Sequence, residues 1–289
     1  MNGVLVLDKP AGMSSAVAVD QVKKRLGAAR AGHGGTLDPI ATGVLPICLD
    51  EATKLAQFLL ADDKAYEADL VLGIETDTLD RTGTITKTTT PDVSRDRFEA
   101  ALVARTGEQD QVPPMYSAIK IAGRRLYHLA RAGEEIEREP RRIRIPALTL
   151  LAWEPPHARI AISCSKGTYV RSLIADLGTD VGCGAHMTEL RRTQSGVFTL
   201  AMAHDLDRLD HPRLVAMTDA TQLPRVTVPA ELEHKVRSGV QLSPEVLSIA
   251  PEIYERFQLL DEHGALVAVG HIETRNERAR VIYDRGFKP

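Results

Sequence analysis

The feature that most constrains this chain is a twelve-residue segment, residues 32–43, which holds four glycines, one histidine and one aspartate. An apolar run over residues 44–49 follows it directly. Glycine loses more backbone freedom on folding than any other residue, so such a cluster marks a special turn or a close approach to a ligand. Asp38, held at that turn, can act as a nucleophile or a base. A plain surface turn, in which Asp38-Pro39 only sets the backbone, explains the same residues.

Composition narrows the class of protein. A chain of 289 residues with 43% hydrophobic residues suggests one large domain or two smaller ones with a sizeable core. Its three cysteines form no CxxC pair, which argues against a zinc knuckle and a disulfide framework. No GxGxxG, P-loop or Cys/His cluster is present, so we expect no cofactor and no metal. The chain has no apolar stretch near the roughly 20 residues that span a bilayer, and we expect it in the cytoplasm without membrane contact.

Charge is unevenly distributed along the chain. The net charge is −3, which taken whole argues against a nucleic-acid binder. Residues 50–112, however, carry a net of −7, and residues 114–171 a net of +6. Such an asymmetry is what a one-sided phosphate-binding face produces, although two solvated faces that partly neutralise each other explain it equally well.

Periodicity and capping residues predict an irregular order of helices and strands. We predict a helix over residues 15–24, capped by Ser14 or Ser15 with a stop near Gly27, and a helix over residues 94–104, capped by Ser94. Further helices are predicted over residues 51–60, 126–131 and 169–181. We predict strands over residues 64–72, 116–121, 142–153, 159–164 and 196–200, and further short strands over 257–261, 266–272 and 279–283. Because helices and strands do not alternate regularly, the pattern favours an α+β fold over a doubly wound sheet. A domain boundary is expected near residues 223–224.

Five segments carry a recognisable pattern, in order along the chain. The first is the Gly-His-x-Gly-Thr-Leu-Asp-Pro-x-Ala-Thr-Gly pattern of residues 32–43, and the others are residues 64–66, 111–120, 165–171 and 184–193. Together they resemble the TruB family, the tRNA pseudouridine-55 synthases. The resemblance runs from about residue 3 to residue 223. It implies a pseudouridine synthase fold, with a mixed, mainly antiparallel central sheet and flanking helices over residues 1–223. It also implies a small β-rich, PUA-like RNA-binding module over residues 224–289.

The resemblance also implies an activity and its partners. The expected reaction converts the uridine at position 55, in the T-loop of tRNA, into pseudouridine, and it needs no cofactor. The target base must leave the stack to reach the enzyme's pocket. The expected partner is the T-stem-loop of tRNA, with no guide RNA and no obligate protein partner. We therefore expect a monomer that acts alone.

Site residues are assigned by the same resemblance. Asp38 is the expected nucleophile, and Arg171 is expected to pair with it and favour its charged form. Tyr66 is expected to stack on the target base and to place its hydroxyl for proton transfer. Tyr169 and Leu190 are expected to line the uracil pocket. The last expected contact is His33, which would occupy the place that the flipped base leaves.

Basic residues of the second half are candidates for phosphate contacts, which position RNA without reading its sequence. The candidates are Lys120, Arg124, Arg142, Arg144 and Lys166. Arg142 and Arg144 share strand parity and should point the same way. Arg191 and Arg192 either touch phosphate or only balance charge.

Two other functions compete with this interpretation. An RNA-folding factor with the same fold but no turnover is disfavoured by the joint presence of Asp38, Tyr66 and Arg171. A hydrolase using His33 and Asp38 on a phosphate-binding loop would depend on metal or nucleotide, and it would leave the segments around Tyr66 and Tyr169 unexplained.

Overall fold

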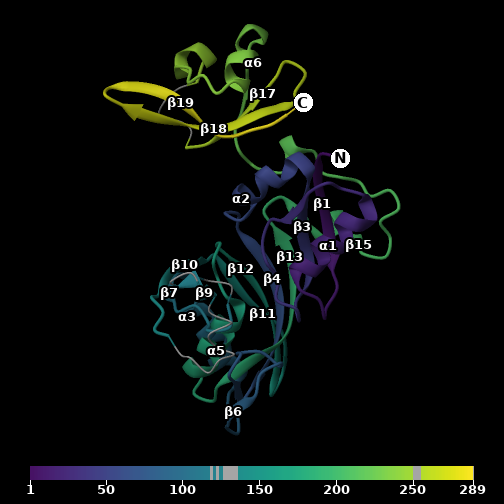
Figure 1. The fold of residues 1–289 in the computed structure, drawn as a ribbon. Helices are drawn as coiled ribbons and strands as arrows, with labels where there is room; N and C mark the ends of the chain where they lie inside the picture. Colours follow the sequence, from purple (N-terminus) through teal and green to yellow (C-terminus); the bar gives the residue numbers. More distant parts are fainter. Residues whose placement is uncertain (118–119, 122–123, 126–135, 250–254, 289) are drawn as a thin grey trace.

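A computed structural model describes residues 1–117, 120–121, 124–125, 136–249 and 255–288. Its centre is a nine-stranded sheet (Figure 1) in which seven strands follow the order β11-β12-β4-β13-β3-β1-β15. These strands are β11 (Ala147–Glu154), β12 (His157–Cys164), β4 (Lys64–Leu72), β13 (Ala185–Ser195), β3 (Thr42–Leu49), β1 (Gly3–Lys9) and β15 (His204–Asp205). Two short strands complete it, since β2 (Ala31–His33) pairs with β3 and β14 (Phe198–Thr199) with β13.

Pairing within this sheet is mixed and mainly antiparallel, as expected. Only the β1–β15 and β13–β3 pairs are parallel. The other described pairs of this sheet, including β13 with β4 and β12 with β4, are antiparallel. Strand β13 lies at the centre of the sheet between β4 and β3, so it joins a late segment of the chain to two early ones.

Both faces of β1 and β3 are covered, which explains their continuous apolar sequences. Leu5 and Leu7 of β1 point into the larger core, together with α1 (Ser15–Leu26), α3 (Arg95–Ala104) and α5 (Val170–Asp180). Their neighbours Val4 and Val6 point into a second core on the other face. An apolar core therefore covers each face of the sheet close to the point where the glycine-rich loop follows β2.

Two of the predicted helices, α1 and α3, begin at predicted serine caps, and α1 ends at the predicted glycine. Helix α1 is capped by Ser14, whose Oγ accepts a hydrogen bond from the Val17 amide at 3.3 Å, and it stops at Gly27, which has a φ of 63°. Ser94 caps α3 in the same way. The helix predicted over residues 51–60 is instead the 3-10 helix η1 (Asp50–Leu55) followed by the short α2 (Ala56–Leu59).

Two strand predictions need correction. The segment predicted as one strand over residues 142–153 is two strands of different sheets, β10 (Arg141–Ile145) and β11, broken at Pro146. β10 pairs with β7 (Gly107–Gln111). Within the segment predicted as a strand over 116–121, the strand that the structure describes is β8 (Lys120–Ile121), which pairs with β9 (Arg124–Arg125). A separate two-stranded ribbon is formed by β5 (Ile74–Thr76) and β6 (Ile85–Thr88). The helix predicted over residues 126–131 lies outside the described residues.

A second, four-stranded sheet forms the C-terminal module, which lies above the large sheet in the view of Figure 1. Its strands are β16 (Arg225–Thr227), β17 (Phe257–Leu260), β18 (Leu266–Arg275) and β19 (Arg278–Gly286), and α6 (Ala230–Arg237) packs on it. Leu260, Leu266, Val269 and Phe287 also join the core that contains Val4 and Val6. The β-rich module is thus docked on the sheet rather than tethered to it.

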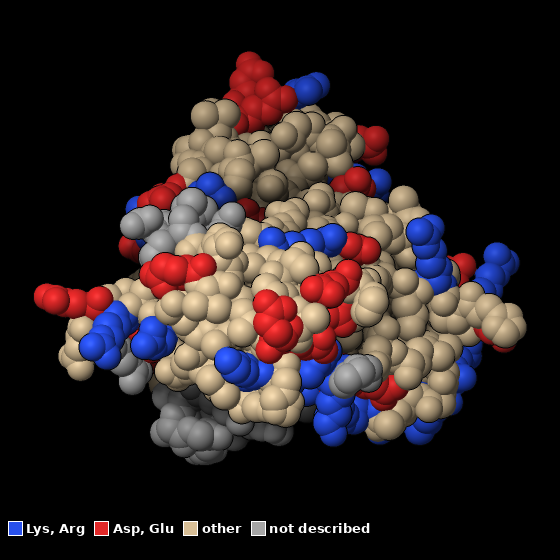
Figure 2. Space-filling view, turned by 90° about the horizontal axis from the view of Figure 1, so that it is seen from above, with Lys and Arg blue, Asp and Glu red and all other residues tan. Residues whose placement is uncertain are grey.

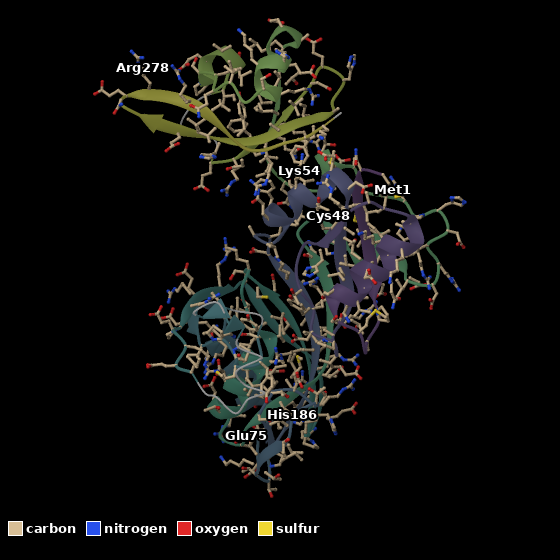
Figure 3. The ribbon with its side chains drawn as sticks, viewed as in Figure 1. Met1, Cys48, Lys54, Glu75, His186 and Arg278 are labelled. Carbon is tan, nitrogen blue, oxygen red and sulfur yellow. The ribbon has the colours of Figure 1, made fainter. Side chains whose placement is uncertain are left out.

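Polar contacts reinforce this docking. Lys54, which Figure 3 labels beside the module, donates to the Gly286 carbonyl at 2.7 Å and pairs with Glu51 at 2.7 Å. The same glutamate accepts from the Lys288 amide. The hydrogen bond from Lys54 and the one from the Lys288 amide lower the pKa of Glu51 to about 2, so this carboxylate stays charged across the physiological range.

Candidate active site

The glycine-rich segment is the loop between β2 and β3, and the chain around it fixes its shape. Ser15, at the start of α1, serves both main-chain groups of Leu37: its Oγ accepts from the Leu37 amide at 2.8 Å and donates to the Leu37 carbonyl at 3.0 Å. The Gly12 amide donates to the Pro39 carbonyl at 2.8 Å. Asp38 therefore sits between two anchored residues, as a preorganised functional group requires.

Gly43 shows why part of this loop must be glycine. Its φ is 97°, and a Cβ added there would lie 2.2 Å from the main-chain oxygen of Arg192. No other residue fits this approach of β3 to β13. Gly43 is therefore required by the protein's own backbone and not by a ligand.

Asp38 and Arg171 form the predicted pair. Arg171, in the first turn of α5, lies with its Nε 2.9 Å from Asp38 Oδ2. The arginine side chain is only 5% exposed, whereas that of Asp38 is 35% exposed. The carboxylate is thus held from behind by a buried cation while one side of it remains open to a substrate.

Three more acceptors fix the Arg171 guanidinium. It donates to the carbonyls of Thr78 and Tyr116, both at 3.0 Å, and its Nη1 lies 3.7 Å from Asp80 Oδ2. Asp80 is itself buried and accepts from Thr82. Arg171 therefore has no freedom to follow Asp38 if the carboxylate moves, and the pair is a rigid device.

The pKa of Asp38 departs from the sequence-based expectation in its net direction. Arg171 lowers that pKa, as expected, but desolvation by burial raises it more, and Asp80 adds to the increase. The pKa of Asp38 is therefore raised above the ordinary aspartate value of 3.8. The paired arginine limits the cost of burying the charge instead of making the carboxyl unusually acidic.

Tyr66 lies on β4 directly opposite Arg192 of β13. Desolvation raises the pKa of the Tyr66 phenol above 10, although a hydrogen bond from Arg192 and the charge of that arginine oppose the increase. The Asp38 charge also acts on the phenol, so the two side chains lie in one electrostatic environment. The Tyr66 phenol is therefore neutral near pH 7, and its environment does not tune it toward a base.

Tyr169 and His33 complete the polar part of the site. Tyr169 caps α5, is half-buried, and its phenol pKa is raised by burial and by the charge of Asp38. His33 ends β2, and its Nδ1 accepts from the Gly35 amide at 3.4 Å. Burial, with help from Arg192, lowers the pKa of His33, so the ring stays neutral near pH 7. A neutral flat ring suits stacking on a base better than acid–base work.

Leu190 belongs to the larger core and is 7% exposed. It sits opposite Ala68 in the pairing of β13 with β4, two residues from the Arg192–Tyr66 pair. Opposed residues of an antiparallel pair share a face, so Leu190 lies on the same side of the sheet as Tyr66. Its place on that face is compatible with the predicted pocket position.

The basic residues predicted to contact phosphate have varied settings. Arg142 and Arg144 both point outward from β10, as strand parity predicts, but Arg142 pairs with Glu108 and Asp110 and Arg144 with Asp63. Lys166 is exposed beside Gly167. Lys120 and Arg124 lie on β8 and β9, and their side chains fall outside the described part of the structure. On the end of the molecule that carries the C-terminal module, acidic and basic side chains are interspersed (Figure 2).

Sequence reasoning missed the role of Arg192. It is 1% exposed and donates to the main-chain oxygens of Val44 at 2.7 Å and Gly35 at 3.1 Å. It cannot touch phosphate, and it ties the catalytic loop to β13. Arg191, its neighbour, points the other way and pairs with Asp8 at 2.7 Å. The missing signal was the strand over residues 185–195, whose alternation would have separated the two arginines.

Lys9 was also missed. It is fully buried and donates to the carbonyls of Pro10 and Met13, both at 2.8 Å. Burial lowers its pKa to about 8, against the attraction of Asp38, which raises it. Only a three-dimensional structure could reveal that this lysine faces the aspartate.

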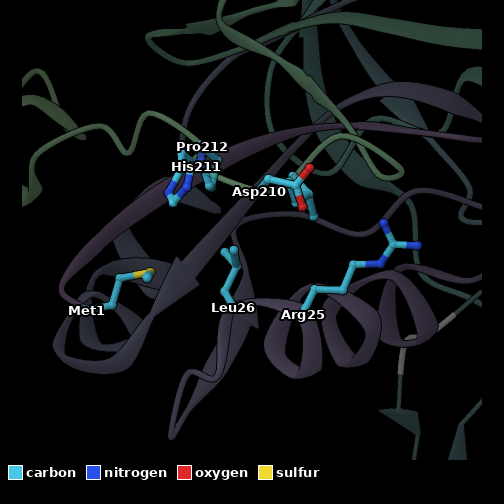
Figure 4. Close-up of a pocket in the computed structure, with 7 residues that line it drawn as sticks. Met1, Arg25, Leu26, Asp210, His211 and Pro212 are labelled. Carbon is cyan, nitrogen blue, oxygen red and sulfur yellow. The ribbon is translucent and has the colours of Figure 1, made fainter.

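Pockets elsewhere in the described part of the chain contain none of the predicted site residues. A pocket beside the N-terminus (Figure 4) is lined by Met1, Arg25, Leu26, Leu209, Asp210, His211 and Pro212, and none of the predicted site residues contributes to it. Among the described residues, no group of three or more His, Cys, Asp or Glu side chains could hold a metal ion. No helix in the described ranges is long and apolar enough to cross a membrane.

Comparisons with known proteins agree with the fold and the site. Residues 23–170 match the N-terminal domain of the TruB family pseudouridylate synthases, and residues 171–233 match the tRNA pseudouridylate synthase B C-terminal domain. The tRNA pseudouridine synthase B of Pseudomonas aeruginosa (strain UCBPP-PA14) is 54% identical over 210 residues, which cover 73% of this chain and 69% of that protein. The protein of the same name from Stutzerimonas stutzeri (strain A1501) is 43% identical over 94% of this chain and 92% of its own length.

Solved structures share the fold over nearly the whole chain. A chain in the crystal structure of a Cbf5-Nop10-Gar1 complex superposes with a TM-score of 0.79 at 28% identity, over 99% of this chain and 85% of that one. A chain in the structure of an H/ACA RNP bound to a substrate RNA containing 2′-deoxyuridine gives 0.75 at 26% identity, over 99% and 85%.

The mixed sheet, the strand-rich C-terminal module and the loop aspartate define an enzyme of the pseudouridine synthase class. Within that class, the chain belongs to the TruB family.

Proposed function

We propose that this enzyme converts the uridine at position 55, in the T-loop of tRNA, into pseudouridine, with Asp38 as the nucleophile. The observation that carries the proposal is the pairing of Asp38 with the buried Arg171, at 2.9 Å, in a loop whose aspartate keeps an open side. The relatives named tRNA pseudouridine synthase B support tRNA as the substrate.

The reaction breaks the C–N glycosidic bond of the uridine, rotates the freed uracil and joins the ribose to a ring carbon. A covalent adduct on Asp38 would divide this change into two easier steps. Asp38 must be ionised to act, and Arg171 limits the cost of that charge in a desolvated setting. No step transfers electrons to or from a cofactor, so no cofactor is proposed.

The base must leave its stack to meet Asp38. In the proposal Tyr66, Tyr169 and Leu190 surround the extruded uracil, and the neutral His33 fills the position that it leaves in the RNA. The protonated phenol of Tyr66, whose pKa is raised by burial, is suited to give a proton to the ring or to hold it by a hydrogen bond.

We assign residues 1–223 to catalysis and residues 224–289 to a PUA-like RNA-binding module. Exposed cations, Arg142, Arg144 and Lys166, with Lys120 and Arg124 as further candidates, would contact the RNA backbone. We propose that the enzyme acts as a monomer in the cytoplasm, without a guide RNA or an obligate protein partner. The partners in the solved complexes belong to those other proteins, and none of them is proposed for this enzyme.

The test uses purified protein and an unmodified tRNA transcript, followed by carbodiimide treatment and primer extension. The proposal predicts one new stop, at the T-loop uridine, and no stop in a transcript that carries cytidine there. A stop at another uridine, with none in the T-loop, would contradict the proposed substrate position.

A further inference from the structure

Gln111 grips the main chain of Tyr169 with both ends of its side-chain amide. The Tyr169 amide donates to Gln111 Oε1 at 2.8 Å, and Gln111 Nε2 donates to the Tyr169 carbonyl at 3.0 Å. The side chain thereby takes the place of a paired strand. Gln111 is 4% exposed, so water does not compete for these bonds.

Among the described residues, no other side chain bonds the main chain of Tyr169. It is the N-cap of α5, where the amide lies outside the helical hydrogen bonds, and its own side chain makes no capping bond. Its carbonyl already accepts from the Leu173 amide at 3.1 Å, and Gln111 supplies the second donor. The main chain at the start of α5 is thus tied to a residue 58 positions earlier in the chain.

The segment that begins at Gln111 reaches the catalytic pair as well. Tyr116, five residues on, offers its carbonyl to Arg171 Nη2 at 3.0 Å. Gln111 and Tyr116 therefore hold the first turn of α5 at two points, one on each side of Val170. The glutamine lies in a segment that the sequence singled out, residues 111–120, but no role in the proposed function falls to it.

We propose that Gln111 is a positioning residue: it fixes the main chain at Tyr169 so that the ring meets the uracil and Arg171 meets Asp38. This inference rests on the proposed function for its catalytic consequence. Binding both main-chain groups of Tyr169 requires one donor and one acceptor on a single planar group, and the glutamine side-chain amide supplies both. A 1 Å displacement at a reacting centre can cost roughly a hundredfold in rate, so loss of the clamp should lower turnover.

The experiment compares Gln111→Ala, Gln111→Glu and the matched control Gln109→Ala at pH 8. Gln109 lies on the same strand, two residues earlier, and its amide donates to the Arg105 carbonyl instead. Gln111→Glu is isosteric and keeps the acceptor for the Tyr169 amide, but at this pH it loses the donor for the carbonyl. The kcat and KM for tRNA are measured together with single-turnover rates. Deuterium uptake is measured for the peptide that spans residues 168–172.

We expect kcat to fall roughly ten- to a hundredfold in Gln111→Ala, less in Gln111→Glu, and not in Gln109→Ala, with KM within about twofold of wild type in all three. Deuterium uptake should be faster only in the two Gln111 variants. If Gln111→Ala does not fold, the Gln111→Glu enzyme carries the same test. Wild-type kcat in a folded Gln111 variant, or a rise in KM alone, would overturn the proposal.

Deuterium uptake does not depend on the substrate. If wild-type enzyme fails to modify the T-loop uridine, the proposed function is wrong, yet the exchange rates still report whether the clamp exists. Unchanged exchange in both Gln111 variants would overturn the clamp itself.

Discussion

Two ion pairs in this enzyme have the same length and opposite settings. Arg171 lies 2.9 Å from Asp38, and Arg142 lies 2.9 Å from Glu108. The Arg171 side chain is 5% exposed and has three further acceptors, whereas that of Arg142 is 61% exposed on a strand edge. Distance alone therefore does not distinguish the Asp38–Arg171 pair from a surface pair, whereas the burial of the arginine does.

The difference sets what each pair can do. Removing one partner of a buried pair leaves a charge and several acceptors without compensation. An exposed pair gains little from its partner, because water and salt screen it. Arg142 and Arg144 can therefore exchange their carboxylates for RNA phosphates at little cost, whereas Arg171 cannot leave Asp38.

The largest expected effect comes from breaking the buried pair. Arg171→Ala leaves Asp80 buried and the Thr78 and Tyr116 carbonyls without their donor. We expect about 3 kcal/mol of lost stability and no detectable turnover. Urea unfolding, with Arg142→Ala as the control, measures the first effect. Equal unfolding midpoints for the two variants would refute the contrast between the pairs.

A large effect is expected at Tyr66, which lies beside the buried pair but carries no charge. Tyr66→Phe keeps the ring and loses the hydroxyl that Arg192 contacts. We expect normal tRNA binding and a rate that is slowed roughly a hundredfold or more, the usual range for a lost acid–base group. Single-turnover kinetics decide the point. A rate near that of the wild-type enzyme would leave Tyr66 with stacking alone.

The acid side of the pH profile sharpens the comparison further. The pKa of Asp38 is raised by burial, and the protonated form cannot act as a nucleophile. Activity should therefore fall as the pH drops through a value above the ordinary aspartate pKa of 3.8. Single-turnover rates from pH 8 downward, with folding monitored by circular dichroism, test this. An acid limb at or below 3.8 in folded protein would contradict it.

The smallest effect is expected at the exposed pairs. Replacing Arg142 and Arg144 by alanine should leave the maximal rate unchanged and weaken tRNA binding. Each phosphate contact on non-duplex RNA contributes a slope of about −0.7 to log affinity against log salt, so the double variant should have a slope shallower by about 0.7 to 1.4. Filter binding across a salt series measures it. An unchanged slope would show that both arginines only serve their carboxylates.

Local signals predicted several helix ends and the strand β4, whereas the pairing of Asp38 with Arg171 came from the family resemblance. Ser14, Gly27 and Ser94 marked helix ends correctly because capping acts over three or four residues. Alternation marked Lys64–Leu72 to the residue. Asp38 and Arg171 were identified as a pair from the family resemblance, and the structure brings them together.

What the sequence could not predict depends on tertiary contacts. The strand over residues 185–195 is buried on one side and bulged at two points, which hides its alternation. Because this alternation was hidden, the opposite orientations of Arg191 and Arg192 were missed as well. The net direction of the Asp38 pKa was missed because the charge of Arg171 can be inferred from a motif, whereas desolvation depends on everything that surrounds the carboxyl.

The most direct test of the central claim compares two aspartates that are each paired with an arginine. Asp38 is 35% exposed beside Arg171, and Asp69 on β4 is 29% exposed at 2.7 Å from Arg159. We predict that Asp38→Asn binds tRNA with wild-type affinity but forms no pseudouridine in a single-turnover assay, whereas Asp69→Asn keeps the wild-type rate. An Asp38→Asn enzyme with more than a few per cent of wild-type turnover would contradict the account.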